Sequence, residues 1–483
     1  MTNIVTVNVQ DDIAIVCLNN PPVNATSTAL RAGLLDAVTK VGAMNVRAAV
    51  LYCAGKTFVA GGDMSEFDAP PAEPHLPDVV QAIEDCPIPF IAAMHGNVLG
   101  GGFEIAMGCA FRVALPKTRF GLPEVHVGLV PGAGGTQRLP RLIGAKTALE
   151  MTTSGAMKPA EEMVEMGGID QVLDADDALA AGIEFAADLP LRPMALSQRD
   201  CAPIETETLT TLRANIEKRA KGQQSPIHCF DMTAMAMNTS FTVAQPQERA
   251  LHLTLRNTAE SRALRHAFFA ERAVSRPSLL ADAKPLDINT VAVVGGGLMG
   301  AGIAFACLNA GLSVILIEQT TDAANAGVDR IEGLITGGIK RGKINDERAA
   351  KMQASLIASA DYAASAPADL AIEAVFEDLG VKQSVFQNLA QHMRTDAVLA
   401  TNTSYIDPRE IMIGIENPNR CIGLHFFSPA HIMKLLEIVH LPDTSATVLA
   451  TGFALGKRLR KVAVLSGICD GFIGNRIVAA YRR

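Results

Sequence analysis

The sequence predicts an α/β protein with two α/β domains and a helical segment between them. In residues 4–115 and again in residues 291–464, short β-branched runs alternate with helix-like segments, which is typical of sheets covered by helices. From about residue 190 to 284, strand-like runs disappear and charged residues are interleaved with Leu and Ala at helical spacing. This middle segment is predicted to be a helical connector whose charges form a solvated helix face.

Length and composition support this organisation. A chain of 483 residues predicts about three domains, and 49% hydrophobic with 19% charged residues excludes a disordered chain. The net charge of −8 supplies no positive field for a phosphate backbone, which argues against nucleic acid as a partner. Nine scattered cysteines without a Cys-x-x-Cys pair indicate reduced thiols, not a disulfide framework or a zinc site.

The first half opens with two predicted strands joined by a turn, and Asn20-Pro21-Pro22 then breaks the chain before a predicted helix at residues 26–41. The strands predicted in this half are residues 4–9, 13–18, 46–52, 90–94 and 112–115. Glycine clusters separate the elements, at residues 61–62, 100–102, 132 and 134–135. Such glycines serve either a close approach of the backbone to a ligand or a tight turn.

Residues 291–308 form a run of eighteen residues without a polar side chain, which is the lower limit for a membrane span. Five of them are glycine, and each glycine costs about 1 kcal/mol relative to alanine in a helix. The run therefore predicts a strand, a turn and a helix, and no membrane span is expected. Further strands are predicted near residues 313–317, 369–372, 398–400 and 421–424.

Two lone acids in the first half are candidate catalytic groups. Glu104 falls in the first turn of an apolar helix that follows three glycines, and Glu124 stands among apolar neighbours twenty residues later. The helix dipole alone favours an acid in a first turn. Alternatively, amides at a glycine-rich helix start stabilise an oxyanion while a carboxylate transfers protons. Sequence spacing does not decide whether the two acids meet in space.

The order of these motifs resembles the enoyl-CoA hydratase/isomerase (crotonase) family. The resemblance rests on residues 56–64, 95–104, 123–124 and 131–140 and spans about residues 1–190. It implies a crotonase-like ββα spiral in which amides of Gly62 and Gly101 hold the thioester oxygen. It also implies that Glu104 and Glu124 handle water and proton, so hydratase activity is expected. Isomerase activity is a further expectation, because moving a double bond needs one proton shuttle, for which Glu124 is the family's usual candidate.

The glycine run in the second half fits a dinucleotide-binding fingerprint. Gly295, Gly297 and Gly300 make the G-x-G-x-x-G pattern between an apolar strand and an Ala-rich helix, and Glu318 ends the next strand. A carboxylate at that place binds the ribose 2′-hydroxyl and repels a 2′-phosphate, which favours NAD over NADP. A glycine-rich turn that binds nothing is the alternative.

Four later motifs, at residues 401–404, 423–429, 433–437 and 470–476, resemble the 3-hydroxyacyl-CoA dehydrogenases over about residues 285–483. The resemblance implies that His425 is the base and that Glu437 orients its imidazole. It assigns substrate contacts to Ser404 and Asn475, and the NAD site to Glu377, Lys382 and Asn402. A histidine between apolar residues is by itself more often a core residue. Ser428, where many members have Asn, and Gly296, within the fingerprint, depart from the family pattern.

The chain is thus divided into four predicted parts: a hydratase domain at 1–190, a helical linker at 191–284, a Rossmann-type NAD-binding domain at 285–464, and the start of a helical domain at 465–483. Hydration makes a 3-hydroxyacyl-CoA and dehydrogenation consumes it, so the whole chain resembles the multifunctional β-oxidation enzymes, peroxisomal or bacterial. Acyl-CoA thioesters are the expected substrates, and a thiolase or a second copy of the chain is the expected partner. Relatives continue beyond the position of Arg483, so we expect robust hydratase and weak or absent dehydrogenase activity.

Two other functions stay open. The second half could bind NAD without catalysis beside a working hydratase, or the first half could catalyse decarboxylation or thioester hydrolysis.

No secretory signal is recognised at the start, and Tyr481-Arg482-Arg483 is not the Ser-Lys-Leu peroxisomal address. The cytoplasm is favoured, or the peroxisome if the chain is eukaryotic. No metal cluster is expected among the ten histidines.

Overall fold

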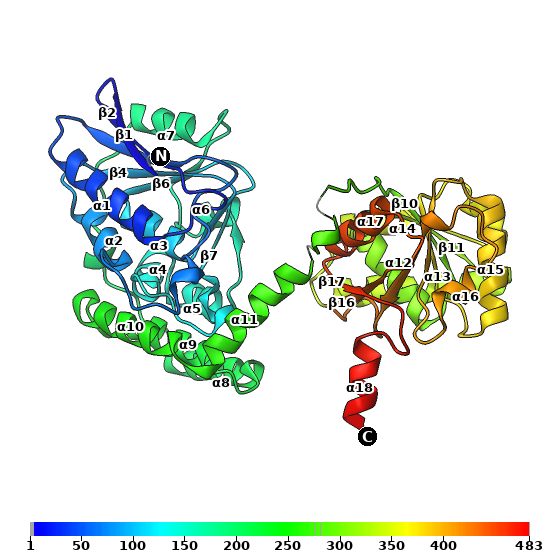
Figure 1. Cartoon of the computed structure of the whole chain (residues 1–483). Coiled ribbons are helices and arrows are strands. Elements are labelled where there is room, and N and C mark those ends of the chain that lie inside the picture. Colours follow the sequence, from blue (N-terminus) through cyan, green and yellow to red (C-terminus); the bar gives the residue numbers. More distant parts are fainter. Residues whose placement is uncertain (1–3, 276, 281, 483) are drawn as a thin grey trace. The chain divides into compact units, whose positions relative to one another are not determined.

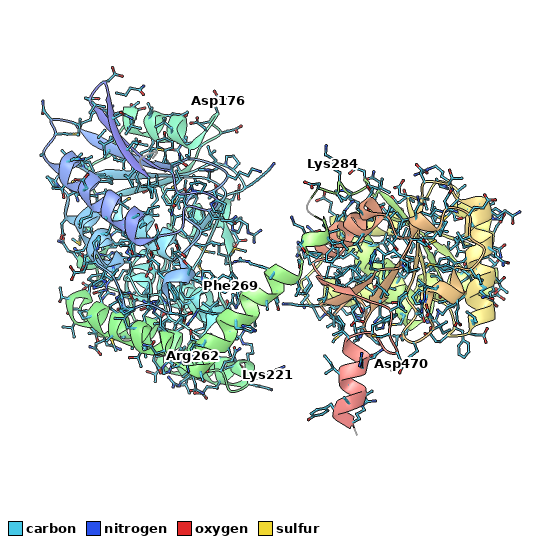
Figure 2. All side chains as sticks on the ribbon, viewed as in Figure 1. Asp176, Lys221, Arg262, Phe269, Lys284 and Asp470 are labelled. Atoms are coloured by element: carbon cyan, nitrogen blue, oxygen red, sulfur yellow. The ribbon has the colours of Figure 1, made fainter. Side chains whose placement is uncertain are left out.

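The computed structural model describes residues 4–275, 277–280 and 282–482. The chain divides into two compact units, Met1–Phe268 and Phe269–Arg483, and Figure 2 labels Phe269, where the second unit begins. None of the helices in the described part of the chain has both the length and the apolar character needed to cross a bilayer.

The first unit is built on a six-stranded sheet of order β1-β2-β3-β4-β6-β9. Its strands are β1 (Val5–Gln10), β2 (Ile13–Leu18), β3 (Ala48–Cys53), β4 (Phe90–Met94), β6 (Phe111–Ala114) and β9 (Gln171–Val172). β1 and β2 pair antiparallel, as expected for a hairpin, and the other neighbours are parallel. The strands and the first helix that were predicted from sequence are confirmed to within about two residues.

A second, three-stranded sheet of order β5-β7-β8 accompanies the first. It consists of β5 (Asn97–Leu99), β7 (Arg119–Gly121) and β8 (Lys158–Pro159). Along the chain, β4 lies in the large sheet, β5 in the small sheet, and the helix α3 (Gly101–Gly108) follows. β6 and β7 repeat this alternation between the sheets, so the chain winds as a ββα spiral.

Helices cover both faces of the large sheet (Figure 1). On one face, α1 (Thr28–Gly42), α2 (Leu76–Asp85) and α3 bury their apolar residues against alternate strand residues such as Leu51. On the other face, α7 (Ala178–Ala187) packs on the intervening residues, among them Val50. This alternation follows from the period of two residues in a strand, which points successive side chains to opposite faces.

The segment expected to be a connector is mostly part of the first unit. Its helices are α8 (Thr206–Ala220), α9 (Ser225–Met235), α10 (Phe241–Arg256) and α11 (Ala259–Val274), and residues up to Phe268 cluster with the first unit. The expectation of a solvated charged face is wrong for Arg256 and Arg265, which are buried. Arg256 donates to the carbonyl oxygens of Glu66 and Ala69, because a buried guanidinium needs acceptors.

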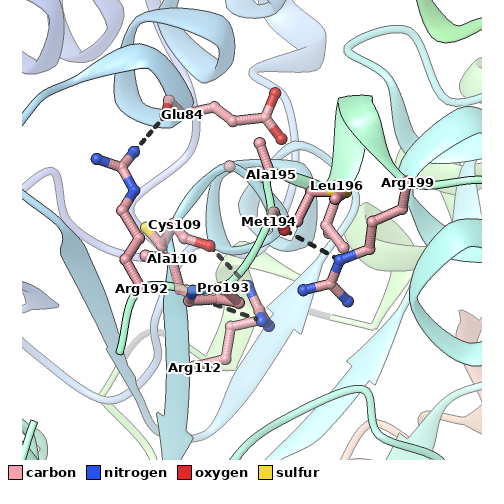
Figure 3. A pocket seen from close by; sticks show the side chains of 11 residues that line it. Glu84, Cys109, Ala110, Arg112, Arg192, Pro193, Met194, Ala195, Leu196 and Arg199 are labelled. Carbon is pink, nitrogen blue, oxygen red and sulfur yellow. Dashed lines mark hydrogen bonds between the residues drawn. The ribbon is translucent and has the colours of Figure 1, made fainter. Parts of the chain in front are cut away.

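Arginine side chains also bind the segment that precedes α8 to the rest of the first unit, through hydrogen bonds to backbone carbonyl oxygens. Figure 3 shows Arg112, Arg192 and Arg199 around a cavity of about 20 Å³, room for about one water molecule. Arg192 donates to the carbonyl oxygens of Glu84 and Cys86 at 2.6 and 2.7 Å. Because these carbonyls end helix α2, the positive charge also meets the negative end of the helix dipole.

The second unit is built on an eight-stranded sheet of order β12-β11-β10-β13-β14-β15-β16-β17. Its strands are β10 (Thr290–Val294), β11 (Ser313–Ile317), β12 (Leu356–Ser359), β13 (Leu370–Glu373), β14 (Val398–Thr401), β15 (Cys421–Phe426), β16 (Leu435–Val439) and β17 (Val462–Ser466). The pairing is parallel throughout except between β15 and β16. The first six strands therefore follow the 3-2-1-4-5-6 order of a dinucleotide-binding fold.

Helices cover both faces of this sheet as well (Figure 1). One core contains residues of α12 (Leu298–Asn309), α13 (Thr321–Lys340) and α17 (Ala446–Arg458). The other contains residues of α15 (Leu379–His392) and α16 (Pro408–Ile411). The predicted strand, turn and helix in residues 291–308 are confirmed as β10, Gly295–Gly297 and α12.

Candidate active sites

The first candidate site lies at the start of helix α3, where Glu104 is 3% exposed. Its Oε1 accepts hydrogen bonds from the amides of Ala133 at 2.7 Å and Gly135 at 2.9 Å. Burial raises the pKa of Glu104, and the two amides act against that rise. A buried acid held by two donors is oriented, and it exchanges a proton more readily near neutral pH than an exposed glutamate would.

Glu124 lies beside the same helix start. It belongs to the short helix η2 (Pro123–Val127), and a Cβ on Gly100 would lie 2.6 Å from its Oε1. Its Oε2 is buried and has no hydrogen-bond partner among the described residues. Burial, and then the charges of Glu104 and Glu248, raise the pKa of Glu124 well above its usual value. The structure thus brings together the two acids that the sequence left apart.

The predicted oxyanion glycines are also neighbours. Leu99 donates to the carbonyl oxygen of Val59 at 3.0 Å, which places residues 59–62 alongside residues 99–101. A Cβ on Gly62 would lie 3.9 Å from Thr26 Oγ1, and one on Gly101 would lie 3.3 Å from the same atom. Among the hydrogen bonds of the described residues, none uses either glycine amide as donor. Two free amides near one point are what an enolate oxygen requires.

The second unit places the glycine fingerprint between β10 and α12. A Cβ on Gly300 would lie 1.7 Å from the carbonyl oxygen of Gly295, so this helix start tolerates only glycine. A Cβ on Gly297 would meet nothing within 4 Å, so the loop is open on that side. Glu318 directly follows β11, and its Oε1 accepts from the amide of Gly296 at 2.5 Å. The open loop at a helix N-terminus and the adjacent carboxylate fit the pyrophosphate and the ribose of NAD.

His425 and Glu437 form the centre of the second candidate site. They are opposite each other on β15 and β16, and His425 Nδ1 donates to Glu437 Oε2 at 2.6 Å. Ser404 Oγ lies 3.3 Å from His425 Nε2.

The other oxygen of Glu437 contacts the last helix of the chain. Glu437 Oε1 accepts from the amides of Ile473 and Gly474 at 3.0 and 2.7 Å. Asn475 follows in the first turn of α18 (Gly474–Arg482), where Figure 1 shows that helix projecting from the sheet.

Glu377 and Lys382 belong to a polar network at the carboxyl ends of β13 and β14. Lys382 is 1% exposed, and its Nζ donates to Glu373 Oε1 at 2.6 Å and Glu377 Oε2 at 3.1 Å. Glu377 accepts from Thr403 Oγ1 at 2.5 Å and from the amide of Ser404 at 2.8 Å. Burial raises the pKa of Glu377, but the bonds from Thr403, Lys382 and Ser404 outweigh it and leave the pKa below its usual value.

Asn402, which directly follows β14, links that strand to β15, the strand of His425. Its Oδ1 accepts from the amide of Phe426 at 2.8 Å, one residue after His425. Within residues 4–275, 277–280 and 282–482, no group of His, Cys, Asp or Glu side chains is arranged to hold a metal ion.

The sequence interpretation missed two buried acids. Glu373 is fully buried and pairs with Lys382; its signal was an acid at the end of an apolar strand, a common place for ligand-binding residues. Glu248 is fully buried in α10, where it accepts from the amides of Gly134 and Thr136. No local signal marked Glu248, because its helix resembled a solvated connector.

Comparisons with known proteins agree with this arrangement. Residues 8–246 match the family described as enoyl-CoA hydratase/isomerase, and residues 290–469 match the NAD-binding domain of 3-hydroxyacyl-CoA dehydrogenase. The NAD assignment and both predicted folds are thereby confirmed.

Relatives match both units together. The chain is 36% identical to the peroxisomal bifunctional enzyme of Danio rerio, over 98% of the chain and 66% of that protein. It is 34% identical to the glyoxysomal fatty acid β-oxidation multifunctional protein of Brassica napus, over 98% of the chain and 68% of that protein. The chain therefore spans about two thirds of the length of these relatives.

A solved structure, 3-hydroxybutyryl-CoA dehydrogenase from Escherichia coli, is also similar, with 39% identity and a TM-score of 0.40 over 41% of this chain and 42% of that one. The match to the Brassica napus protein spans both units. The chain belongs to the family of multifunctional fatty acid β-oxidation proteins.

Proposed function

We propose that the chain is a bifunctional enzyme that hydrates 2-enoyl-CoA to 3-hydroxyacyl-CoA and then oxidises that product with NAD to 3-oxoacyl-CoA. We assign hydration to the first unit and oxidation to the second. The observation that carries the proposal is the unpartnered Glu124 Oε2 beside Glu104. A buried carboxyl oxygen without a partner is costly for folding, and its retention at a helix start with free amides is characteristic of a catalytic site.

The two carboxyl groups divide the hydration chemistry between them. Glu104 is held by two amides, which offset part of the effect of burial on its pKa, so we assign it the role of the base that takes a proton from the attacking water. The pKa of Glu124 is raised well above its usual value, so of the two acids Glu124 is the one that holds a proton more firmly, and it delivers that proton to C2. The water oxygen bonds to C3, and the double bond between C2 and C3 is lost. Amides of Gly62 and Gly101 hold the thioester oxygen while the enolate exists.

The dehydrogenase residues manage the proton of the 3-hydroxyl group. His425 Nε2 takes this proton, and Ser404, 3.3 Å away, holds the same hydroxyl in place. Because His425 Nδ1 donates to Glu437, the carboxylate fixes the tautomer and stabilises the imidazolium that forms. Bound NAD supplies the acceptor for the hydride that leaves C3. Gly297, Glu318 and Lys382 are the residues proposed to line its site.

Isomerisation of 3-enoyl-CoA to 2-enoyl-CoA is a second proposed activity of the first unit. It needs one group that removes a proton from C2 and returns it to C4. The unpartnered oxygen of Glu124 supports this role, since it is not already occupied by a donor; isomerisation starts from the carboxylate form of Glu124, whereas hydration starts from its acid form.

We further propose that the product passes to a thiolase, because a 3-oxoacyl thioester is the substrate for cleavage by a second thiol. A second copy of the chain is the alternative partner.

All nine cysteines are free, which supports a reducing compartment. The relatives are named peroxisomal or glyoxysomal. We propose the peroxisome for a eukaryotic source and the cytoplasm for a bacterial one.

The proposal is tested by assaying each half-reaction separately on the full chain. Crotonyl-CoA alone should lose its enoyl absorbance, and 3-hydroxybutyryl-CoA with NAD should produce NADH. Absence of the first reaction would overturn the hydratase assignment, and absence of the second would favour a second unit that binds NAD without catalysis.

A further inference from the structure

Four successive backbone amides in the first unit are shared between two buried carboxylates. Glu104, from α3, accepts from Ala133 and Gly135 at 2.7 and 2.9 Å. Glu248, from α10, accepts from the two amides that alternate with these, Gly134 at 2.6 Å and Thr136 at 2.7 Å. The Thr136 hydroxyl also donates to Glu248. The segment 133–136, which we call the amide clamp, is therefore held from both sides.

The same helix fixes the residues that precede the clamp. His252 lies one turn after Glu248 in α10, and its Nδ1 donates to the carbonyl oxygen of Val130 at 2.7 Å. A Cβ on Gly132 would lie 2.6 Å from the His252 ring, so the backbone passes directly over the imidazole. Helix α10 thus positions residues 130–136 through Glu248 and His252.

We propose that Glu248 is a positioning residue of the hydratase site, which holds the amide clamp in the one conformation that orients the Glu104 carboxylate. This inference rests on the proposed function. Every hydrogen bond described for the Glu104 carboxylate comes from the clamp, and half of the clamp amides are held by Glu248. Without Glu248, Gly134 and Thr136 would turn toward other acceptors, and the peptide planes that carry the Ala133 and Gly135 amides would turn with them.

A purely structural role gives a different expectation. Glu248 also lies at the first turn of α4 (Gly135–Ile143), where a carboxylate stabilises a helix. In that role its removal would lower stability and leave the reaction at Glu104 unchanged in every folded molecule. The two roles differ in whether the effect of removing Glu248 depends on Glu104.

Kinetics of crotonyl-CoA hydration by the full chain separate these roles. Glu248→Gln keeps the size of the side chain but turns an amide group toward amide donors, so kcat should fall about 10- to 100-fold while KM changes less than about threefold. Gln247→Ala, on the exposed face of the same helix, should leave both constants unchanged. NADH formation from 3-hydroxybutyryl-CoA should be unaffected in both variants, which reports that the second unit is intact.

The double variant Glu104→Gln/Glu248→Gln should be no slower than Glu104→Gln alone, because a group that acts through Glu104 has no effect once Glu104 is gone. A further loss in the double variant, or an unchanged kcat in Glu248→Gln, overturns the proposal. If Glu248→Gln does not fold, Thr136→Val removes one of the three donors to Glu248 and should lower kcat severalfold, and an unchanged kcat there overturns the proposal as well.

Hydrogen exchange of the clamp amides in the absence of substrate keeps this inference separate from the proposed function. The amides of residues 133–136 should exchange at least about tenfold faster in Glu248→Gln than in the wild type, and equal rates would overturn the proposal. Faster exchange in a chain that does not hydrate crotonyl-CoA would overturn the proposed function and retain Glu248 as a positioning residue of the Glu104 site.

Discussion

His425 Nδ1 lies 2.6 Å from Glu437 Oε2 because the two residues face each other across the antiparallel pair β15 and β16. The neighbouring strands on both sides are parallel. The carboxylate occupies Nδ1, so Nε2 is left to face Ser404. The strand pairing therefore decides which ring nitrogen is available to a substrate.

His425→Ala should abolish most NADH formation, by about 10²- to 10⁴-fold, because it removes the proposed general base. Hydration of crotonyl-CoA should be unchanged, since its residues lie in the first unit. NADH formation from 3-hydroxybutyryl-CoA measures the effect. Unchanged NADH formation would mean that the second unit does not use His425 in catalysis.

Glu124→Gln should lower hydration of crotonyl-CoA by about 10²- to 10⁴-fold, because an amide cannot deliver the proton to C2. Glu150→Gln, an exposed acid on α5 (Ala145–Ser154), is the matched control and should retain full activity. The loss of enoyl absorbance measures both. A Glu124→Gln variant with the wild-type rate would assign the proton to another group.

Lys382→Met should lower the free energy of unfolding of the second unit by about 3–5 kcal/mol, because it leaves Glu373 buried without its cation. Lys351→Met, exposed on α14 (Asp346–Ala354), should change it by less than about 0.5 kcal/mol. Denaturant unfolding of the full chain measures both. The double variant Glu373→Gln/Lys382→Met should recover part of the loss, and no recovery would contradict the pairing argument.

Glu318→Gln should weaken NAD binding about 10- to 100-fold, because it removes the charged acceptor proposed for the ribose hydroxyl. Glu318→Arg should in addition favour NADP over NAD, since a cation attracts the 2′-phosphate. Titration of each variant with both dinucleotides measures the change. Equal preference for NAD in wild type and Glu318→Arg would show that Glu318 does not contact the ribose.

His252→Asn should flatten the dependence of stability on pH between about 4 and 6.5. Burial lowers the pKa of His252 to about 4, whereas the unfolded value is about 6.5. The unfolded state therefore binds more protons in this window, so the His252 contribution to stability is full above pH 6.5 and is lost as pH falls to 4. The loss amounts to about 3 kcal/mol.

The free energy of unfolding of the first unit, measured from pH 4 to 7 in both proteins, tests this prediction. Glu104, Glu124 and Glu248 have raised pKa values and contribute the opposite slope, because the folded state then binds more protons. They are common to both proteins, so the difference between the two curves isolates His252. Parallel curves would contradict a buried neutral imidazole.

The sequence predicted the strands and singled out Glu104 and Glu124 because their signals are local, but it did not show that the two acids lie together. Parallel strands buried on both faces are continuous apolar runs, as in residues 291–294, and glycines mark the backbone turns next to Glu104 and at Gly295. Glu248 had no such signal, because its partners Gly134 and Thr136 are more than a hundred residues away. Burial of Arg256 and Arg265 likewise depends on long-range packing, which helical periodicity does not reveal.

A single reaction of the full chain with crotonyl-CoA, to which NAD is added after the enoyl absorbance has fallen, tests whether one chain carries out both steps. We predict that NADH appears only after NAD is added and that it forms from the hydrated product, so that Glu124→Gln and His425→Ala each prevent it. Loss of enoyl absorbance with no NADH at any NAD concentration would contradict a bifunctional enzyme and leave a hydratase with a non-catalytic NAD-binding unit.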